Sequence, residues 1–313
     1  MEDNSGIRIF ASFSMTYRER WFVALLLLGY LATGIFYALD NPLYLKPDEY
    51  YHFAFVKHLL DGNGLPSVNT SQIGVTNHSL VEAEAHQPPL YYATVAVMAA
   101  TFQLQEYLVP TRNPHFLSTE QGNHNVWTPL YAHLSQVPIF LSGRLLSLLC
   151  SVVALIFIYR LARLHVAPQV ALLGVALIGL NPQFLFIATA FSNDMACVMM
   201  IHIGLWMIVV SIRQRLTLRW SITLGVVIAL ATLTKIGGMG LFAPLGILVL
   251  WQAWKDKELR PLFHAALTFA VWLLLCSWWL WRNWLLYHDP LTTTLLPILL
   301  GVREEPFTGE ILR

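Results

Sequence analysis

Residues 21–39 have the sequence WFVALLLLGYLATGIFYAL, which contains no charged side chain. A helix needs about 20 apolar residues to cross the hydrocarbon core of a bilayer, so this stretch predicts a transmembrane helix. The segment KPDEYYHF follows at residues 46–53 and sets two carboxylates among aromatic side chains. The chain therefore places ionisable groups directly where the predicted helix leaves the membrane.

The composition supports a membrane protein. Of the 313 residues, 56% are hydrophobic and only 12% are charged, against about 25% charged residues in soluble proteins. The formal net charge of +1 gives no basis for binding nucleic acid or another polyanion. Cys150, Cys197 and Cys276 all lie in apolar runs, so they are interpreted as core residues and not as a disulfide or metal framework.

We predict an all-α polytopic membrane protein that forms one domain over residues 1–313. Apolar runs of suitable length recur along the chain. Seven transmembrane helices are expected, at residues 21–39, 138–160, 169–190, 195–212, 220–235, 238–254 and 263–281.

Lysine and arginine set the expected orientation, because cytoplasmic loops of membrane proteins are enriched in them. With residues 1–20 in the cytoplasm, every short inner loop is basic. Residues 40–137 then form a large outer loop, residues 138–281 a six-span bundle, and residues 282–313 an outer C-terminal segment. The apolar stretch 88–103 is expected to lie in the outer interface or to dip in and return, because a full span would invert every later basic loop.

Asp48 and Glu49 belong to a predicted short amphipathic helix that starts at Pro47. One interpretation is structural, since carboxylates in a first turn complement the helix dipole by about 0.3–1 kcal/mol. The other is functional: a carboxylate at this level can act as a general base, or it can join Asp194 in holding a divalent ion such as Mg²⁺ or Mn²⁺. His52 lies four residues after Asp48, so their side chains can meet.

Further polar side chains are predicted at the outer face: His86, Arg144, Asn193, Asp194, Lys235 and Arg282. His86 can form a polar wall of a cavity that faces the acid pair. Structural interpretations also exist, because Asp194 can cap its helix, Lys235 can snorkel and Arg282 can anchor its helix beside tryptophans. Their gathering at one face nevertheless indicates a reaction on an anionic, lipid-borne substrate.

The order of these motifs resembles a known family. Pro-Asp-Glu is followed by PPLYY, GRLLSLL…YRLAR, NPQFLF…SND, LTKIGG and WRNWLLYHDPL. This order is similar to that of the GT-C superfamily of integral-membrane glycosyltransferases, close to the protein O-mannosyltransferase and aminoarabinose transferase branch. The resemblance covers essentially residues 20–295.

The resemblance implies transfer of a hexose or pentose from a polyprenyl-phosphate donor, with a catalytic aspartate in the first outer loop. Carried over by position, Asp48 would deprotonate the acceptor hydroxyl and Glu49 would be its partner. Residues 192–194 would line the donor or acceptor cavity, and Lys235 and Arg282 would neutralise the leaving lipid phosphate. The expected location is a bacterial plasma membrane, with the N-terminus cytoplasmic and the active face extracytoplasmic.

Two departures from the family pattern stand out. Residues 104–137 are interpreted as an insertion, and the further spans of family members do not follow residue 281, so a truncated fragment or a short member is expected. A transporter or lipid flippase, and a non-catalytic scaffold related to the transferases, are the competing hypotheses. The sugar, the acceptor, metal dependence and oligomeric state are left open.

Overall fold

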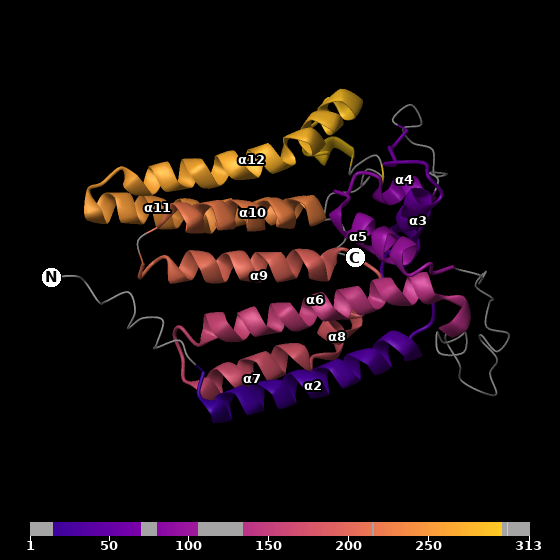
Figure 1. The fold of residues 1–313 in the computed structure, drawn as a ribbon, viewed down its shortest axis with the longest axis horizontal. Coiled ribbons are helices and arrows are strands. Elements are labelled where there is room, and N and C mark those ends of the chain that lie inside the picture. The colour runs from indigo at the N-terminus through magenta and orange to yellow at the C-terminus, as the bar shows by residue number, and fades with distance from the viewer. Residues whose placement is uncertain (1–14, 70–79, 106–133, 215, 296–298, 300–313) are drawn as a thin grey trace, which may run out of the picture.

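The computed structural model describes residues 15–69, 80–105, 134–214, 216–295 and 299, and within these ranges it contains helices and connecting segments but no β-strand (Figure 1). The elements are α2 (Tyr17–Asp40), α3 (Glu49–Leu60), α4 (Leu80–Glu84), α5 (Leu90–Thr101), α6 (Pro138–Ala162), α7 (Pro168–Gly179), α8 (Pro182–Ala188), α9 (Asp194–Val210), α10 (Leu218–Thr234), the 3₁₀ helix η3 (Ile236–Leu241), α11 (Phe242–Asp256), α12 (Arg260–Tyr287) and the 3₁₀ helix η4 (Thr293–Leu295).

Four helical segments are long and apolar enough to cross a membrane: α2, α6, the segment Ile236–Asp256 formed by η3 and α11, and α12. The pair α7 and α8 adds a fifth if it is one bent span. The shorter apolar helices α9 and α10 lie in the same bundle (Figure 1). The all-α polytopic membrane fold is therefore confirmed, whereas the number of seven spans stays a prediction.

The segment predicted as the span 169–190 contains a sharp bend. The axes of α7 and α8 differ by 67°. Pro182 cannot donate a backbone hydrogen bond, so the chain restarts as a new helix there. Asn181 caps this helix, because its side-chain oxygen accepts from the backbone N–H groups of Gln183 and Phe184. The Asn-Pro dipeptide was the sequence signal of the break.

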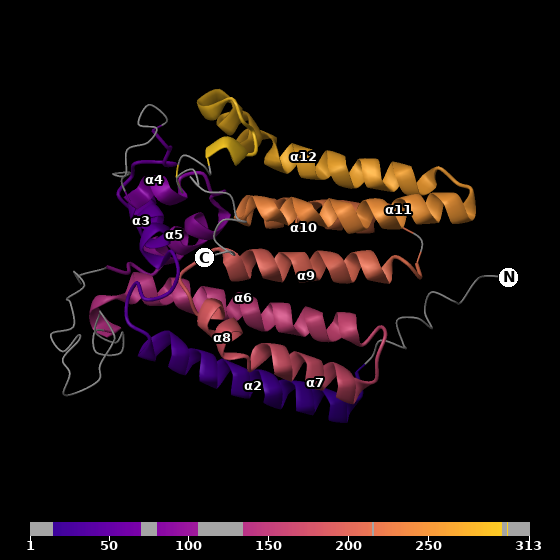
Figure 2. The same ribbon diagram turned by 180° about the vertical axis from the view of Figure 1, so that it is seen from behind.

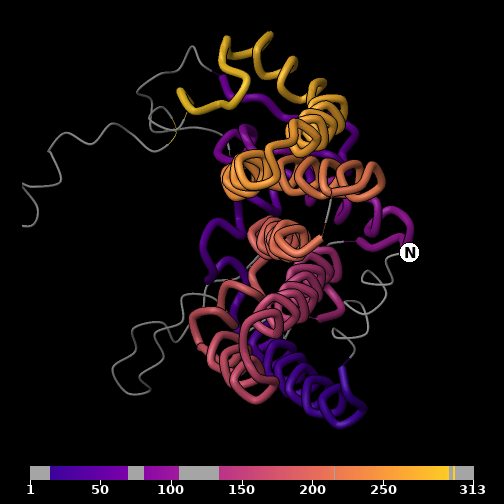
Figure 3. Tube along the Cα trace, turned by 90° about the vertical axis from the view of Figure 1, so that its left-hand side faces the viewer, coloured from indigo at the N-terminus to yellow at the C-terminus, as the bar shows by residue number. Residues whose placement is uncertain are grey.

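The long helices lie side by side, and the short helices gather at one end of them. Figures 1 and 2 show α3, α4 and α5 together at the end of the bundle where α2 stops and α6 begins. Viewed from the end, the row runs from α2 and α7 through α6 and α9 to α10 and α12 (Figure 3). The fold thus brings the segments before α3, α6 and α9 and the end of α10 to one side.

The helix predicted to start at Pro47 instead starts at Glu49. Asp48 occupies the N-cap position with φ 60° and ψ 3°, in the left-handed region, and its side chain makes no capping hydrogen bond. This conformation is costly for a residue with a Cβ atom, by roughly 1 kcal/mol or more. The reason lies in the neighbouring Glu49 side chain, which is buried and held by α6 as described below.

The core has one cluster rich in aromatic side chains near α3 and a second cluster among α9–α12, in which aliphatic side chains pack with Trp272. The Phe55 and Tyr92 rings stack with centroids 4.0 Å apart and join α3 to α5. Outward-facing leucines remain exposed on helices of the bundle: Leu25 at 59%, Leu173 at 60% and Leu274 at 75%. An apolar surface of this kind on helices of spanning length is suited to contact with lipid.

Candidate functional site

Glu49 is enclosed at the base of the site. Its carboxylate forms a bidentate pair with Arg144, with Nε donating to Oε1 and Nη2 to Oε2, both at 2.8 Å. The backbone N–H groups of Phe191 and Lys46 donate to the same carboxylate at 2.9 and 3.4 Å. Both side chains of the ion pair are 0% exposed. This geometry favours a positioning role for Glu49, which has no free face to present to a substrate.

Arg144 also donates hydrogen bonds to the segment that connects α2 to α3. Nη1 donates to the carbonyl oxygens of Ala38 and Asn41, and Nη2 to that of Pro42, each at 2.7 Å. Together with the two bonds to Glu49, these use the five N–H donors of a guanidinium. The substrate-binding role predicted for Arg144 stays a prediction. In the structure its side chain forms an internal tie, by which we mean that its hydrogen bonds connect α2, α3 and α6 inside the protein.

Asp48 lies directly above this tie and is exposed. The buried neighbour Glu49 fixes the backbone, so the Asp48 carboxylate is presented from a rigid and unusual conformation. Strained backbone of this kind is concentrated at functional sites. Among the residues that were predicted to be catalytic, Asp48 is the one whose carboxylate can be reached from solvent.

Lys235 and Asp194 form an ion pair at the same end of the bundle as Asp48. Lys235 follows the last residue of α10, Asp194 opens α9, and the Lys235 Nζ lies 2.6 Å from Oδ1 of Asp194. Their side chains are 40% and 38% exposed, so the pair faces solvent on one side. Burial lowers the pKa of Lys235, but the Asp194 carboxylate outweighs it and the net pKa is raised. The lysine therefore carries its positive charge.

Glu84, on α4, is a further ionisable residue of the site. Its side chain is 11% exposed, and its Oε2 has no hydrogen-bond partner among the described residues. Burial raises the pKa of Glu84 to about 8, Asp48 and Asp194 raise it further, and Lys235 lowers it. Glu84 was not among the predicted site residues, because nothing in VEAEAHQPP distinguishes it from the neighbouring Glu82.

His52 points toward α5 and α4, whereas the sequence placed it beside Asp48. Its Nδ1 is 2.7 Å from the Tyr92 hydroxyl and 3.9 Å from Oε2 of Glu84. Burial lowers the pKa of His52 to about 3, so the imidazole is neutral at physiological pH. The ring therefore makes a hydrogen bond with the Tyr92 hydroxyl, whereas the Glu84 carboxyl group lies beyond hydrogen-bond distance.

His86 and Asn193 meet at Gln87. The Gln87 amide nitrogen lies 3.1 Å from Nε2 of His86, and its oxygen accepts from Nδ2 of Asn193 at 3.3 Å. Asn193 also donates to the carbonyl oxygen of Thr234 at 2.9 Å, while its own Oδ1 is buried without a partner in the described part of the chain. Burial lowers the pKa of His86. These contacts join the segment before α5 to α9 and the end of α10.

Arg282 lies on α12, and no contact of the described residues joins it to this cluster. Its Nη2 donates to the carbonyl oxygen of Pro66 at 2.6 Å, and Nη1 to Oδ1 of Asn283 at 3.3 Å. The guanidinium is 4.9 Å from the centroid of the Trp279 ring. The structure thus brings eight of the nine predicted site residues to the α3–α5 end of the bundle, with Arg282 at the neighbouring end of α12 (Figure 1).

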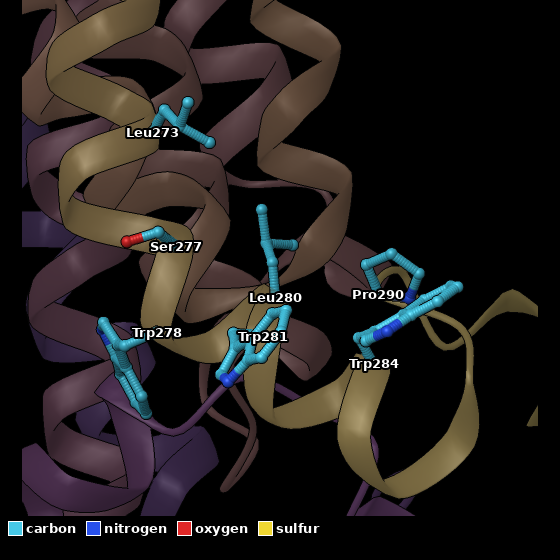
Figure 4. Close-up of a pocket in the computed structure, with 7 residues that line it drawn as sticks. All are labelled: Leu273, Ser277, Trp278, Leu280, Trp281, Trp284 and Pro290. Atoms are coloured by element: carbon cyan, nitrogen blue, oxygen red, sulfur yellow. The ribbon is translucent and has the colours of Figure 1, made fainter.

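An apolar groove of about 740 Å³ follows the same end of α12 (Figure 4). We call it the α12 groove, and its lining residues are Leu273, Ser277, Trp278, Leu280, Trp281, Trp284 and Pro290. Figure 4 shows the Trp281 and Trp284 rings on the side toward Pro290. The groove offers flat aromatic surfaces next to a basic residue.

A divalent-ion site was one of the open alternatives, and in the described residues no three His, Cys, Asp or Glu side chains are grouped so that they could hold a metal. Asp194 is occupied by Lys235, whose ammonium group would repel a cation.

Comparison with known proteins finds a match to a family over part of the chain and a likeness to a solved structure. Residues 130–281 match the family described as dolichyl-phosphate-mannose-protein mannosyltransferase. The structure of the S. cerevisiae protein O-mannosyltransferase Pmt1–Pmt2 complex bound to the sugar donor has the same fold, with a TM-score of 0.60 and 16% sequence identity. The match covers 96% of this chain and 39% of the yeast chain. No curated protein matches the chain.

The predicted resemblance to the protein O-mannosyltransferase branch of the GT-C superfamily is therefore confirmed. Arg144, Asn193, Asp194 and Lys235 fall inside the matched segment 130–281. The Asp48 segment and α3–α5 precede the segment that the family model matches, and the structural likeness covers 96% of the chain.

Proposed function

We propose that this chain is a membrane glycosyltransferase, or the catalytic part of one, that moves a sugar from a polyprenyl-phosphate donor to an acceptor hydroxyl at the outer face of the membrane. The observation that carries the proposal is the exposed Asp48 carboxylate, held in a left-handed backbone by the buried Glu49–Arg144 pair. Lys235 supplies a positive charge on the same side. The family match supports a mannose donor as the first to test.

The proposed reaction is a displacement at the anomeric carbon of the donor sugar. Asp48 accepts the proton of the acceptor hydroxyl as the oxygen attacks that carbon, and the bond between the carbon and the phosphate oxygen breaks. The negative charge then develops on the lipid phosphate, which Lys235 and Arg282 neutralise. Positioned acid–base groups of this kind contribute about 10²–10⁴-fold to a rate, and preorganised cations stabilise the leaving group.

The site lies at the end of the spanning helices, which suits a donor that cannot leave the bilayer. In the proposed complex the isoprenoid chain follows the α12 groove, because its aromatic lining adjoins Arg282 in the chain. The chain spans 39% of the length of the yeast protein. The proposal therefore does not specify the acceptor, the choice between hexose and pentose, or a partner chain.

The test compares wild type with Asp48→Asn in native-like membranes that contain radiolabelled polyprenyl-phosphate mannose. The near-isosteric amide cannot accept the proton, so release of mannose from the lipid should fall by about 10²–10⁴-fold while donor binding persists. Asp61→Asn, at the other end of α3, is the matched control and should keep full activity. Equal turnover by wild type and Asp48→Asn would reject the assigned base. Donor binding without turnover in wild type would instead favour a scaffold.

A further inference from the structure

A pocket that is lined by both polar and apolar side chains lies at the opposite end of the bundle from Asp48. It has a volume of about 720 Å³, within the range of roughly 300–1,000 Å³ that is typical of ligand sites. It lies between the beginning of α2, the end of α6 and α7, and we call it the α2–α7 pocket. Figure 1 shows these helix ends together, away from α3–α5.

The rim of this pocket, at the ends of the helices, is polar and held by several hydrogen bonds. Glu19 is buried, and its Oε1 accepts from the Tyr159 hydroxyl at 2.6 Å and from Nε of Arg163 at 2.7 Å. Glu19 also forms a capping box with Thr16 at the start of α2. These bonds lock α2 to α6, so the rim has a defined shape before any ligand arrives.

The charge of the rim is positive. Arg18 and Arg163 line the pocket with a single carboxylate, Glu19, which is already occupied by Arg163. The Arg18 side chain is exposed, and its guanidinium lies 5.6 Å from the centroid of the Phe22 ring. One guanidinium is thus placed over an aromatic wall, where it can meet an anion.

The floor of the pocket is apolar and runs along the helices into the bundle. Its residues are Phe22, Val23, Leu26, Leu172, Leu173 and Ala176. From Arg18 to Leu26 the helix rises about 12 Å, at 1.5 Å per residue. Leu173 is also 60% exposed on the outer surface of a predicted span, so the floor is accessible from the side that lipid contacts. The pocket is polar at the end of the helices and apolar deeper in.

We infer that the α2–α7 pocket binds an anionic membrane phospholipid, with its phosphate at Arg18 and Arg163 and an acyl chain along the apolar floor. The gradient from charge to hydrocarbon matches the two parts of such a lipid, and the net positive rim selects the anionic kind. This site does not involve Asp48 or Lys235 and does not depend on the proposed transfer reaction.

The test is native mass spectrometry of the full chain in detergent, titrated with phosphatidylglycerol or with phosphatidylcholine of the same acyl chains. Phosphatidylglycerol should bind more tightly. Arg18→Gln should weaken it about fivefold, the contribution of one basic residue near an anionic headgroup, and should leave phosphatidylcholine binding unchanged. Arg20→Gln is the matched control: it removes the same charge from the same exposed turn but does not line the pocket.

A second pair of variants tests the floor. Ala176→Trp should fill the pocket and abolish the tight site, whereas Leu177→Trp, at a neighbouring position that is 68% exposed and outside the lining, should bind like wild type. Equal losses in Arg18→Gln and Arg20→Gln would show attraction by overall charge and overturn the proposal. Equal binding by Ala176→Trp and Leu177→Trp would overturn it as well.

Discussion

The guanidinium of Arg144 donates five hydrogen bonds inside the protein, two of them to the Glu49 carboxylate. Removal of one partner from a buried ion pair leaves an uncompensated charge. Arg144→Leu should therefore reduce the free energy of unfolding by about 3–5 kcal/mol. Arg144→Lys should recover part of the loss, because lysine keeps the charge without the planar fork.

Thermal unfolding of the purified chain in detergent measures this difference. Arg160→Leu, on the exposed face of the same helix, is the control. It should cost less than about 1 kcal/mol, since its visible contacts are with the Phe157 and Trp206 rings. Equal destabilisation by Arg144→Leu and Arg160→Leu would contradict the role of Arg144 as an internal tie.

Glu84 should make the stability depend on pH. Burial raises its pKa from 4.5 to about 8 in the folded protein. Between these values the folded state holds a proton that the unfolded state has lost, so this contribution to stability is complete below pH 4.5 and is lost as the pH rises through 8. The full difference is on the order of 5 kcal/mol.

Unfolding followed from pH 5 to pH 8.5 tests this. Glu84→Gln cannot lose a proton, so its stability should decline less with rising pH than that of wild type. Glu82→Gln, two residues earlier on α4, should keep the wild-type slope. A wild-type slope in Glu84→Gln would show that the carboxyl group is already ionised in the fold.

Sequence alone could assign the site residues to one face but not their individual surroundings. The parity of the spans was enough to place Asp48, Asp194 and Lys235 on the same side. It could not show that the adjacent Glu49 is buried, because adjacent residues of a helix point in different directions and the partner, Arg144, is 95 residues away. Glu84 stayed unnoticed for the same reason, since burial in the folded protein is the main cause of its raised pKa, followed by the charge of Asp48.

At the scale of elements, α10 and α12 approach closely at Gly225. A Cβ atom on Gly225 would lie 2.7 Å from the carbonyl oxygen of Thr268 and 2.8 Å from Cβ of Val271, both on α12. Gly225→Ala should therefore force the helices apart and destabilise the fold by about 1–3 kcal/mol.

The matched control is Gly246→Ala on α11, where an added Cβ meets nothing within 4 Å. It should be neutral or stabilising by up to about 1 kcal/mol, because alanine favours the helix. Chemical denaturation in mixed micelles compares the two variants. A stabilising effect at both positions would mean that α10 and α12 are not in close contact.

Helix positions were the most predictable feature. The predicted spans 138–160 and 195–212 lie close to α6 and α9, because apolar runs between polar loops set the ends of such helices. The bend between α7 and α8 depends on Pro182. The length of the apolar run at residues 169–190 predicted a single span and gave no sign of the bend. The stretch predicted as an interfacial helix forms α5, which packs against α3 and α6. The part of the predicted insertion that covers residues 106–133 lies outside the described residues.

At the scale of the whole molecule, the two pockets and the ion pairs divide between opposite ends of the bundle. The predicted orientation puts Asp61, after α3, outside the cell and Lys257, between α11 and α12, inside. In intact cells, a membrane-impermeant maleimide should label Asp61→Cys, and should label Lys257→Cys only after permeabilisation. The native cysteines are buried and give a low background. Labelling of both positions from outside would contradict the orientation.

The contacts of Arg144 also attach the segment that contains Asp48 to α6, so that the two move together. The guanidinium holds the carbonyl oxygens of Ala38, Asn41 and Pro42 together with Glu49, so a tilt of α6 carries the segment with it. Lys235 is attached to other helices, α9 and α10. The proposed base is therefore attached to α6 and the proposed phosphate ligand to α9 and α10, so the distance between them is set by the packing of α6 against α9.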